Sequence, residues 1–233
     1  MKNCDTIPKE QVKAILFDFD DTLGNRETYS HRTYEKLVDE IAPNLDPWER
    51  EILIQQCLIY EQYGDVDKSY VRNRVLEVFG IDLGEGLSQY WTDHQWESVV
   101  LYDDAIPVIE ELKKRGYRIG IITNGNARGQ RPKIEKSGVL PYLDVLVISG
   151  DADVKKPDPR IFKLAADQLG LAVQECAFVG DMMRNDMYGA YRAGMVPIWI
   201  WPHNRDRYSE VKVARIETLT DLLSLFAGVR TKI

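Results

Sequence analysis

Five short apolar runs are spaced along the chain, and each is followed closely by acidic, glycine or small polar residues. The runs are continuous rather than alternating and are rich in β-branched residues, which is typical of strands that are buried on both faces of a sheet. We therefore predict five sheet strands, at residues 14–17, 118–122, 145–148, 177–179 and 197–201.

Helical patterns lie between most of these runs, and their boundaries carry stop signals. Basic residues precede Gly116, and a Gln-Leu pair precedes Gly170. An alternation of strand and helix predicts an α/β fold, here a Rossmann-like parallel sheet with helices on both faces. Ligands bind such sheets beyond the carboxyl ends of the strands. The polar residues that follow the runs would therefore share one edge, namely Asp18, Thr123, Ser149 and Asp181.

One long segment, residues 25–99, interrupts the alternation because it contains no convincing strand pattern. Its apolar residues recur with helical spacing, and proline and glycine residues divide it into pieces. We predict an inserted all-helical domain at residues 25–99, with residues 1–24 and 100–233 forming the sheet domain. Such an insertion can act as a lid over a site, whereas the alternative is a packing module without a catalytic role.

The composition narrows the classes of partner. The formal net charge is -7, and acidic and basic residues are interspersed without a long run of one sign, which argues against a nucleic-acid partner. The three cysteines are far apart and fit neither a disulfide framework nor a zinc site. The first 13 residues are polar, and no apolar run approaches the roughly 18 residues of a membrane span. We predict a cytoplasmic protein without a membrane partner, and its oligomeric state stays open.

The first strand is followed by three acidic residues, Asp18, Asp20 and Asp21. Alternate side chains of an extended segment share a face, so Asp18 and Asp20 leave the strand in related directions. Carboxylates this close repel each other by about 4 kcal/mol per pair at roughly 4 Å and an effective dielectric constant near 20. A divalent cation such as Mg²⁺, which prefers oxygen ligands, would offset this repulsion, whereas the alternative is a turn with capping carboxylates.

Two further segments contain residues that could bind a phosphate group or neutralise its charge. Thr123, Asn124 and Gly125 follow the second strand, where a hydroxyl and exposed N–H groups could hold phosphate oxygens, although the same residues also form ordinary turns. Lys156 follows the third strand and could neutralise a nucleophile and a phosphate, or be a solvated surface group. On this reasoning Lys155 is an equal candidate.

The fourth strand ends at Gly180 and Asp181, and Asp186 lies five residues further on. Gly180 permits a sharp turn, and Asp181 can complete a metal site. Asp186 can brace a metal-bound water or the lysine from outside the ligand shell. The alternative role for either aspartate is to cap a helix.

Together these segments read Asp-x-Asp-x-Thr, Thr-Asn-Gly, Lys-Pro and Gly-Asp-(x)4-Asp, each directly after a predicted strand. The series resembles the haloacid dehalogenase superfamily, from Lys13 to about Trp201. The resemblance implies a Rossmann-like core and a helical cap of the superfamily's first type, which would be residues 25–99. The match to the Lys-Pro segment favours Lys156 over Lys155.

The resemblance also implies a role for each motif residue. Asp18 would attack phosphorus and form an aspartyl-phosphate, while Asp20 would protonate the leaving oxygen and later deprotonate water. Mg²⁺ would be held by the Asp18 carboxylate, the Asp20 backbone carbonyl and Asp181, with Asp186 outside the ligand shell. Thr123 and Asn124 would bind the phosphoryl group, and Lys156 would offset its charge.

The carboxylate at Asp20 also bears on the reaction, because superfamily members that cleave carbon–halogen bonds lack an acid at that position. We therefore predict a phosphatase that hydrolyses small phosphorylated metabolites. A phosphomutase of the same superfamily keeps both aspartates and is one alternative. A receiver-like signalling module that accepts a phosphoryl group on aspartate is an alternative from another class. The sequence identifies no particular substrate; Asn25, Arg26 and His31 could face a leaving group or be solvated cap residues.

Overall fold

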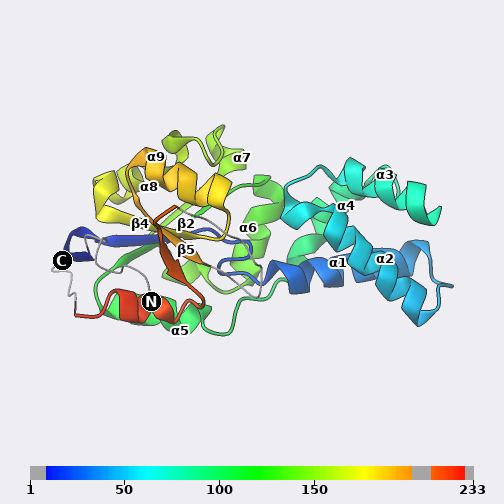
Figure 1. Cartoon of the computed structure of the whole chain (residues 1–233), viewed down its shortest axis with the longest axis horizontal. Coiled ribbons are helices and arrows are strands. Elements are labelled where there is room, and N and C mark those ends of the chain that lie inside the picture. The colour runs from blue at the N-terminus through cyan, green and yellow to red at the C-terminus, as the bar shows by residue number, and fades with distance from the viewer. Residues whose placement is uncertain (1–8, 201–210, 229–233) are drawn as a thin grey trace. The chain divides into compact units, whose positions relative to one another are not determined.

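The computed structural model of the chain describes residues 9–200 and 211–228 (Figure 1). The chain divides into two compact units. One unit, here called the core, comprises residues 1–24 and 101–233, and the other, here called the cap, comprises residues 25–100. The last residue of the predicted fifth strand, Trp201, lies outside the described residues.

The core is built on a parallel sheet of six strands in the order β3-β2-β1-β4-β5-β6. In this order β1 lies between β2 and β4, so that Phe17 pairs with both Ile121 and Val179. All four residues of β1 are buried, as its continuous apolar sequence requires. The strands are β1 (Ala14–Phe17), β2 (Arg118–Thr123), β3 (Val145–Ile148), β4 (Cys176–Gly180), β5 (Val196–Ile200) and β6 (Ala214–Ile216).

Helices cover both faces of this sheet (Figure 1). On one face α8 (Pro159–Leu169) and α9 (Tyr188–Ala193) pack against the strands, and Phe162 of α8 meets Phe178 of β4 edge to face at 5.0 Å. On the other face lie α5 (Ala105–Lys114) and α10 (Asp221–Leu225). The other helical elements described in the core are two helices and four short helical turns. They are α6 (Ala127–Lys136), α7 (Ser149–Ala152) and the turns Lys9–Gln11, Leu140–Tyr142, Val173–Glu175 and Met183–Met187.

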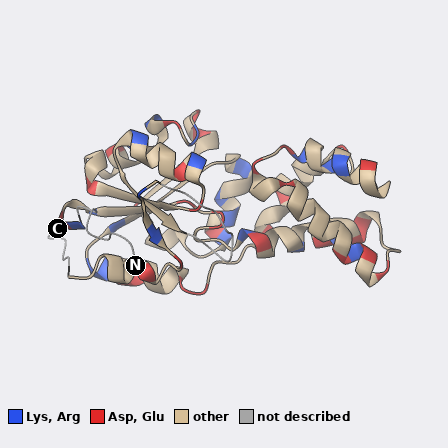
Figure 2. Cartoon of the chain, viewed as in Figure 1, with Lys and Arg blue, Asp and Glu red and all other residues tan. Residues whose placement is uncertain are grey.

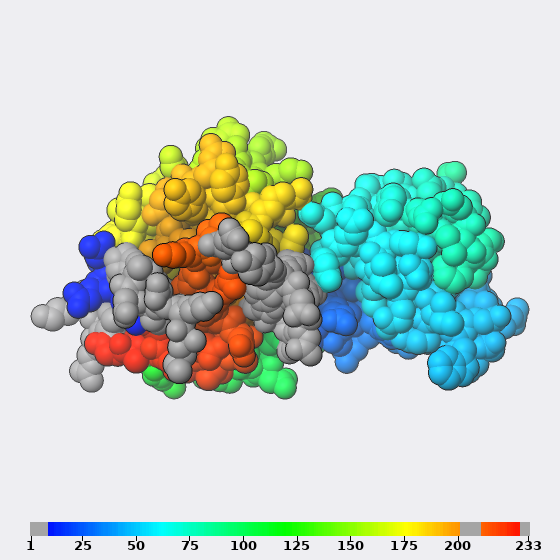
Figure 3. All heavy atoms as spheres, in the orientation of Figure 1, coloured from blue at the N-terminus to red at the C-terminus, as the bar shows by residue number. Residues whose placement is uncertain are grey.

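The cap consists of four α-helices and two short 3-10 turns around an apolar core of its own. The space-filling view shows the blue and cyan atoms of this unit packed against one another (Figure 3). Asp46 begins α2 with a reciprocal capping box to Glu49, which satisfies free N–H groups at the helix start. The elements are α1 (Arg26–Ile41), α2 (Pro47–Tyr60), α3 (Lys68–Phe79), α4 (Leu87–His94), Gln62–Gly64 and Gln95–Ser98.

The predicted fold class is confirmed, because the described residues form a parallel α/β sheet with helices on both faces and a separate helical unit. Gly170 ends α8 in a left-handed conformation, as its position after a helical pattern predicts. The strand β6 was not predicted, because it has only three residues and includes Arg215, so that it makes no continuous apolar run. Its hydrogen bonds to β5 define it instead.

Lysine and arginine are interspersed with aspartate and glutamate along the helices of both units (Figure 2). In the described residues, no helix combines the length and the apolar character that crossing a lipid bilayer requires.

Candidate active site

Asp18 lies directly after β1, at the carboxyl edge of the sheet, and its side chain is almost fully buried. Its backbone N–H donates to the Val179 carbonyl at 2.8 Å, which continues the pairing of β1 with β4. Burial raises the pKa of the Asp18 carboxyl from 3.8 to about 7; Lys156 opposes the rise, while Asp186 and Asp20 add to it. A buried carboxylate beside a cation, in a place where charge is costly, is a typical setting for a nucleophile.

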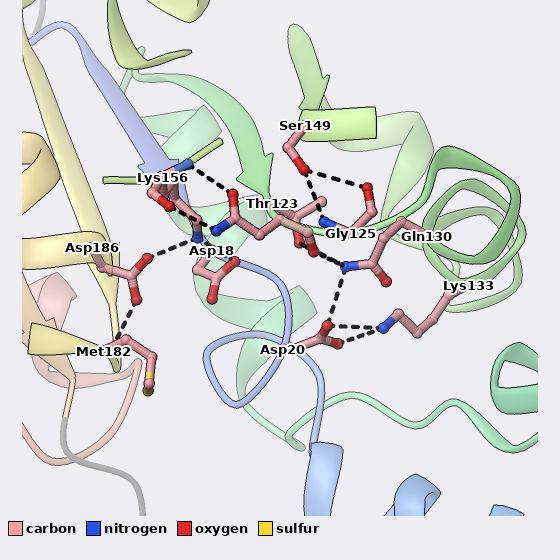
Figure 4. A network of polar contacts seen from close by, with 11 residues as sticks. Asp18, Asp20, Thr123, Gly125, Gln130, Lys133, Ser149, Lys156, Met182 and Asp186 are labelled. Carbon is pink, nitrogen blue, oxygen red and sulfur yellow. Dashed lines mark hydrogen bonds and ion pairs between the residues drawn. The ribbon is translucent and has the colours of Figure 1, made fainter. Parts of the chain in front are cut away.

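Lys156 is the cation at this position, and its side chain is only 2% exposed. Its Nζ lies 2.7 Å from Asp18 Oδ1 and 2.7 Å from Asp186 Oδ1, so the ammonium lies between two carboxylates (Figure 4). Burial alone would lower the pKa of Lys156, but the two carboxylates raise it above its ordinary value. Lys155, the competing candidate, is exposed. The structure thus brings Lys156 and not Lys155 to Asp18.

The Asn124 side chain contacts the loop that carries Lys156. Its amide Nδ2 donates to the Lys156 carbonyl at 3.0 Å, and its Oδ1 accepts from the Lys156 N–H at 2.8 Å. Both ends of the Asn124 side chain are therefore engaged by the main chain of Lys156. The side chain thereby connects the segment after β2 to the loop that carries Lys156, and a phosphate contact of Asn124 stays a prediction.

Asp20 points away from Asp18 and Lys156 (Figure 4). Its carboxylate is held by two side chains of α6: Lys133 Nζ lies 2.7 Å from Oδ1 and 2.9 Å from Oδ2, and Gln130 Nε2 donates to Oδ2 at 3.1 Å. The Gln130 amide also donates to Thr123 Oγ1 at 2.8 Å. Thr123, the last residue of β2, and Asp20, which follows β1, are thus connected through a single glutamine.

The group that could hold a metal ion is formed by Asp18, Asp181 and Asp186. All three are buried, and one carboxylate oxygen from each lies within 4.8 Å of the other two. Three carboxyl groups against a single ammonium group, that of Lys156, give this cluster an acidic excess, which suits a divalent cation. Carboxylate oxygens are the ligands preferred by hard cations such as Mg²⁺. Asp186, expected outside the ligand shell, belongs to this group, whereas the Asp20 carboxylate is directed to α6.

Local contacts position Asp181 and Asp186, the two aspartates that follow β4. Asp186 lies in a π-helical turn, Met183–Met187, and its Oδ2 accepts from the Met182 N–H at 2.8 Å. Gly180 permits this approach, because a Cβ atom there would lie 2.6 Å from the Asp186 carboxyl group. The Trp199 indole N–H donates to the Asp181 carbonyl at 2.8 Å and so holds the loop that carries Asp181.

Three residues of this site were not predicted from the sequence, namely Gln130, Lys133 and Trp199. Gln130 and Lys133 are three positions apart, so they share one face of the helix that follows Thr123-Asn124-Gly125. That spacing was the signal available in the sequence. Trp199 lies inside an apolar strand, and nothing in the sequence distinguishes its indole N–H from that of a packing residue.

The polar residues at the start of the cap have partners within the cap. Asn25 caps α1 by accepting from the Thr28 N–H at 3.1 Å. Arg26 forms an ion pair with Glu61, and His31 contacts Glu51 at 3.1 Å. These contacts give each of the three residues a structural role.

A buried aspartate, a bridging lysine and an acidic, metal-compatible cluster thus lie together at one edge of a parallel α/β sheet. The sequence profile of haloacid dehalogenase-like hydrolases matches residues 12–194. The chain belongs to this family, as the motifs predict. The match favours a hydrolase over a receiver-like module.

Individual relatives agree with this assignment. The chain is 29% identical over 227 residues to a glyceraldehyde 3-phosphate phosphatase of Methanopyrus kandleri, covering 91% of this chain and 97% of the relative. It is 29% identical over 206 residues to an N-acylneuraminate-9-phosphatase of Mus musculus, covering 82% and 83%. The crystal structure of a phosphatase of this family from Thermococcus onnurineus superposes with a TM-score of 0.64 at 30% identity, covering 94% of this chain and all of that one. The chain is a phosphoric monoester hydrolase of the haloacid dehalogenase-like family.

Proposed function

We propose that this protein is a magnesium-dependent phosphatase that hydrolyses small phosphorylated metabolites through an aspartyl-phosphate on Asp18. The observation that carries the proposal is the position of Lys156, whose Nζ lies 2.7 Å from Asp18 Oδ1. Because the ammonium binds Oδ1, the other carboxylate oxygen, Oδ2, would attack phosphorus. Its positive charge also attracts the phosphoryl group to a site that already contains carboxylates.

In the first half of the reaction, a bond forms between an Asp18 carboxylate oxygen and phosphorus while the ester P–O bond breaks. Asp20 gives its proton to the departing ester oxygen, which leaves as an alcohol. Thr123 Oγ1 accepts from the Gln130 amide at 2.8 Å and donates to the Asn124 carbonyl at 3.4 Å, a long contact that the hydroxyl would exchange for a phosphoryl oxygen. Lys156 offsets the charge that the transferring group carries.

In the second half, Asp20 takes a proton from a water molecule whose oxygen attacks phosphorus. The bond from phosphorus to Asp18 breaks, inorganic phosphate leaves, and the Asp18 carboxylate is restored. Asp20 thereby regains the proton that it gave up, and the cycle closes with all atoms balanced. One carboxyl group acts as acid and then as base, which requires it to keep its orientation through both halves.

Asp18, Asp181 and Asp186 would hold the magnesium ion, with the Asp20 backbone carbonyl as the further ligand that the family resemblance implies. A bound divalent cation supplies positive charge next to the phosphoryl oxygens and lowers the repulsion between phosphate and carboxylates. The fit rests on the donor chemistry, since the cluster is entirely made of oxygen ligands and carries excess negative charge.

The relatives favour phosphomonoesters of terminal hydroxyl groups as the substrate class. The names glyceraldehyde 3-phosphate phosphatase and N-acylneuraminate-9-phosphatase both describe such esters, although the rest of each substrate differs greatly in size. An alkoxide leaving group is strongly basic, so its departure needs a proton donor. The carboxyl group of Asp20 supplies that donor in this chain.

The decisive experiment measures phosphate release from a panel of phosphorylated metabolites, with and without magnesium, for the wild type and Asp18→Asn. We expect turnover that requires magnesium and falls by at least about a thousandfold in the variant, since loss of a nucleophile leaves little catalysis. Acid quenching during turnover should trap phosphate covalently on the wild type only. A matched control is Asp167→Asn, which changes an exposed aspartate of α8 and should leave turnover unchanged.

Two results would contradict the proposal. Equal turnover by the wild type and Asp18→Asn would show that Asp18 is not the nucleophile. Turnover that is the same after exhaustive chelation would show that the carboxylate cluster has no catalytic cation.

A further inference from the structure

Lys133 is a buried lysine on the face of α6 that also buries Gln130 and Ile134. Its side chain is only 1% exposed, although lysine is among the residues least often fully buried. Removing an ammonium group from water is costly unless a partner compensates for the lost hydration. The compensating group here is the carboxylate of Asp20, with both oxygens within 2.9 Å of Nζ.

Gln130 strengthens the same contact from one helical turn earlier. Its amide donates to Asp20 Oδ2 and to Thr123 Oγ1, so it joins the acid/base carboxyl group to the hydroxyl at the end of β2. Gln130 is itself placed by Gly125, whose backbone lies directly against the glutamine side chain. Both α6 side chains therefore point toward Asp20 (Figure 4).

These contacts determine the orientation of Asp20. One ammonium group bound to both carboxylate oxygens, together with an amide on Oδ2, fixes both side-chain torsions of the aspartate. The Asp20 side chain remains 24% exposed, so a leaving group or a water molecule can still reach it. Proton transfer requires the donor within hydrogen-bonding reach of the reacting oxygen, and misplacement by about 1 Å can cost roughly a hundredfold in rate.

We infer that Lys133 is a positioning residue that holds the Asp20 carboxyl group in the orientation for proton transfer, with Gln130 as its second support. The inference rests on the proposed function, because it requires Asp20 to be the acid and base. When one oxygen of Asp20 carries the proton, the other still accepts from Lys133. The orientation is therefore kept in both halves of the cycle.

The dependence of rate on the leaving group separates this role from a merely structural one. In the first half-reaction the proton of Asp20 passes to the ester oxygen as the P–O bond breaks. An alkyl ester needs that proton, whereas an aryl ester such as p-nitrophenyl phosphate expels a weakly basic oxygen without much assistance. Loss of orientation at Asp20 should therefore slow the alkyl ester far more than the aryl ester.

The test compares kcat/KM of Lys133→Met and the wild type for p-nitrophenyl phosphate and for a series of less acidic aryl and alkyl phosphates. Methionine keeps the length of the side chain and removes the charge. We expect about a 30-fold loss or more for alkyl phosphates and no more than about threefold for p-nitrophenyl phosphate, because misplacing the acid forfeits part of the roughly 100- to 10,000-fold that general acid catalysis contributes. The ratio of the two rates comes from one sample, so it is independent of the fraction that folds.

Two variants serve as references. Lys133→Arg keeps the positive charge and the paired contact with a carboxylate, so it should recover most of the alkyl activity. Lys136→Met changes an exposed lysine one turn further along α6 and should leave the ratio of the two rates unchanged. A fall of the same factor for every ester in Lys133→Met would overturn the inference and assign Lys133 to stability alone.

The same aryl and alkyl phosphates, measured with Asp20→Asn, distinguish failure of the inference from failure of the proposed function. If Asp20→Asn itself shows no preferential loss on alkyl esters, then Asp20 is not the acid and the proposed mechanism fails. If Asp20→Asn shows that loss, adding Lys133→Met to it should cost less than about threefold more, because two residues that act through one group are not additive. Full additivity would show that Lys133 acts independently of Asp20.

Discussion

Asn124 holds the main chain of Lys156 by both of its polar groups. The amide Nδ2 donates to the Lys156 carbonyl at 3.0 Å, while Oδ1 accepts from the Lys156 N–H at 2.8 Å. The two residues are separated by 32 positions and follow different strands, so this pair ties the loop after β2 to the loop after β3. The lysine that contacts Asp18 is therefore fixed at its backbone as well as at its ammonium group.

Asn124→Ala should lower activity because it releases this backbone. We expect kcat/KM to fall about 10- to 100-fold, since small displacements of a positioned charge are costly in phosphoryl transfer. The matched control is Asn126→Ala, which removes a helix cap that accepts from the Arg128 N–H at 2.9 Å. That control should cost about 1 kcal/mol of stability and change activity less than about twofold. Equal activities for the two variants would contradict the role assigned to Asn124.

Trp199→Phe tests whether the Asp181 loop is held from β5. The change keeps an aromatic ring in the sheet but removes the indole N–H that donates to the Asp181 carbonyl. We expect the magnesium concentration for half-maximal activity to rise about tenfold, because contacts that orient a ligand commonly contribute that much to metal affinity. Trp91→Phe, a buried tryptophan of the cap, is the control for loss of an indole ring and should leave the magnesium dependence unchanged. An unshifted magnesium titration for Trp199→Phe would show that the indole contact is dispensable.

Gly125→Ala should disturb Gln130 through direct contact. Gly125 has φ +143°, and an added Cβ would lie 2.7 Å from Gln130 Cγ, so both strain and overlap are introduced. We expect kcat to fall at least about tenfold as Gln130 shifts away from Thr123 and Asp20. Gly138→Ala is the matched control, with φ +81° but no atom within 4 Å of the added Cβ. It should cost about 1 to 2 kcal/mol in stability from strain and leave kcat near that of the wild type.

The sequence predicts the strands well wherever hydrophobicity alone decides the structure. All five predicted runs overlap observed strands, because a strand buried on both faces must be apolar throughout. The short edge strand β6 lacks that signal and depends on hydrogen bonds to β5. The motif residues lie together at one edge because parallel strands end on the same side, so the general position of Asp18 and Asp181 follows from topology.

The individual contacts of the site do not follow from the sequence. The sequence shows Asn124 as a polar residue after a strand, but only the geometry shows that its amide binds the Lys156 main chain. Similarly, Asp186 is one of two aspartates in a segment, and the π-helical turn decides that its carboxylate joins the acidic cluster. Such assignments depend on side-chain torsions and distances of about 1 Å, which residue types and spacings do not specify.

A buried ion cluster in the cap gives a stability that depends on pH. Glu61 is 1% exposed and forms ion pairs with both Arg26 and Lys68, while the Tyr34 hydroxyl donates to Glu61 Oε2 at 3.2 Å. The Lys68 ammonium also lies 3.4 Å from the centre of the Trp91 ring. Burial would raise the pKa of Glu61, but the two cations outweigh it and lower the pKa from 4.5 to about 2.

The depressed pKa of Glu61 predicts a loss of stability in acid that a glutamine variant would not share. Between pH 4.5 and about 2 the unfolded chain binds a proton at Glu61 and the folded chain does not, so the stabilisation is complete above pH 4.5 and falls as the pH falls. The full contribution is about 3 kcal/mol, from about 1.4 kcal/mol for each unit of pKa.

Glu61→Gln should therefore destabilise the protein by about 3 to 5 kcal/mol at pH 7, because two buried cations lose their carboxylate. That difference from the wild type should shrink steadily as the pH is lowered from 5 towards 2.5. Urea unfolding followed by helical circular dichroism at pH 3, 4, 5 and 7 measures the difference. Glu77→Gln, an exposed glutamate of the cap paired with Arg74, provides the control and should give a small difference at every pH. A large but pH-independent difference for Glu61→Gln would show that Glu61 stabilises the cap by packing and not through its charge.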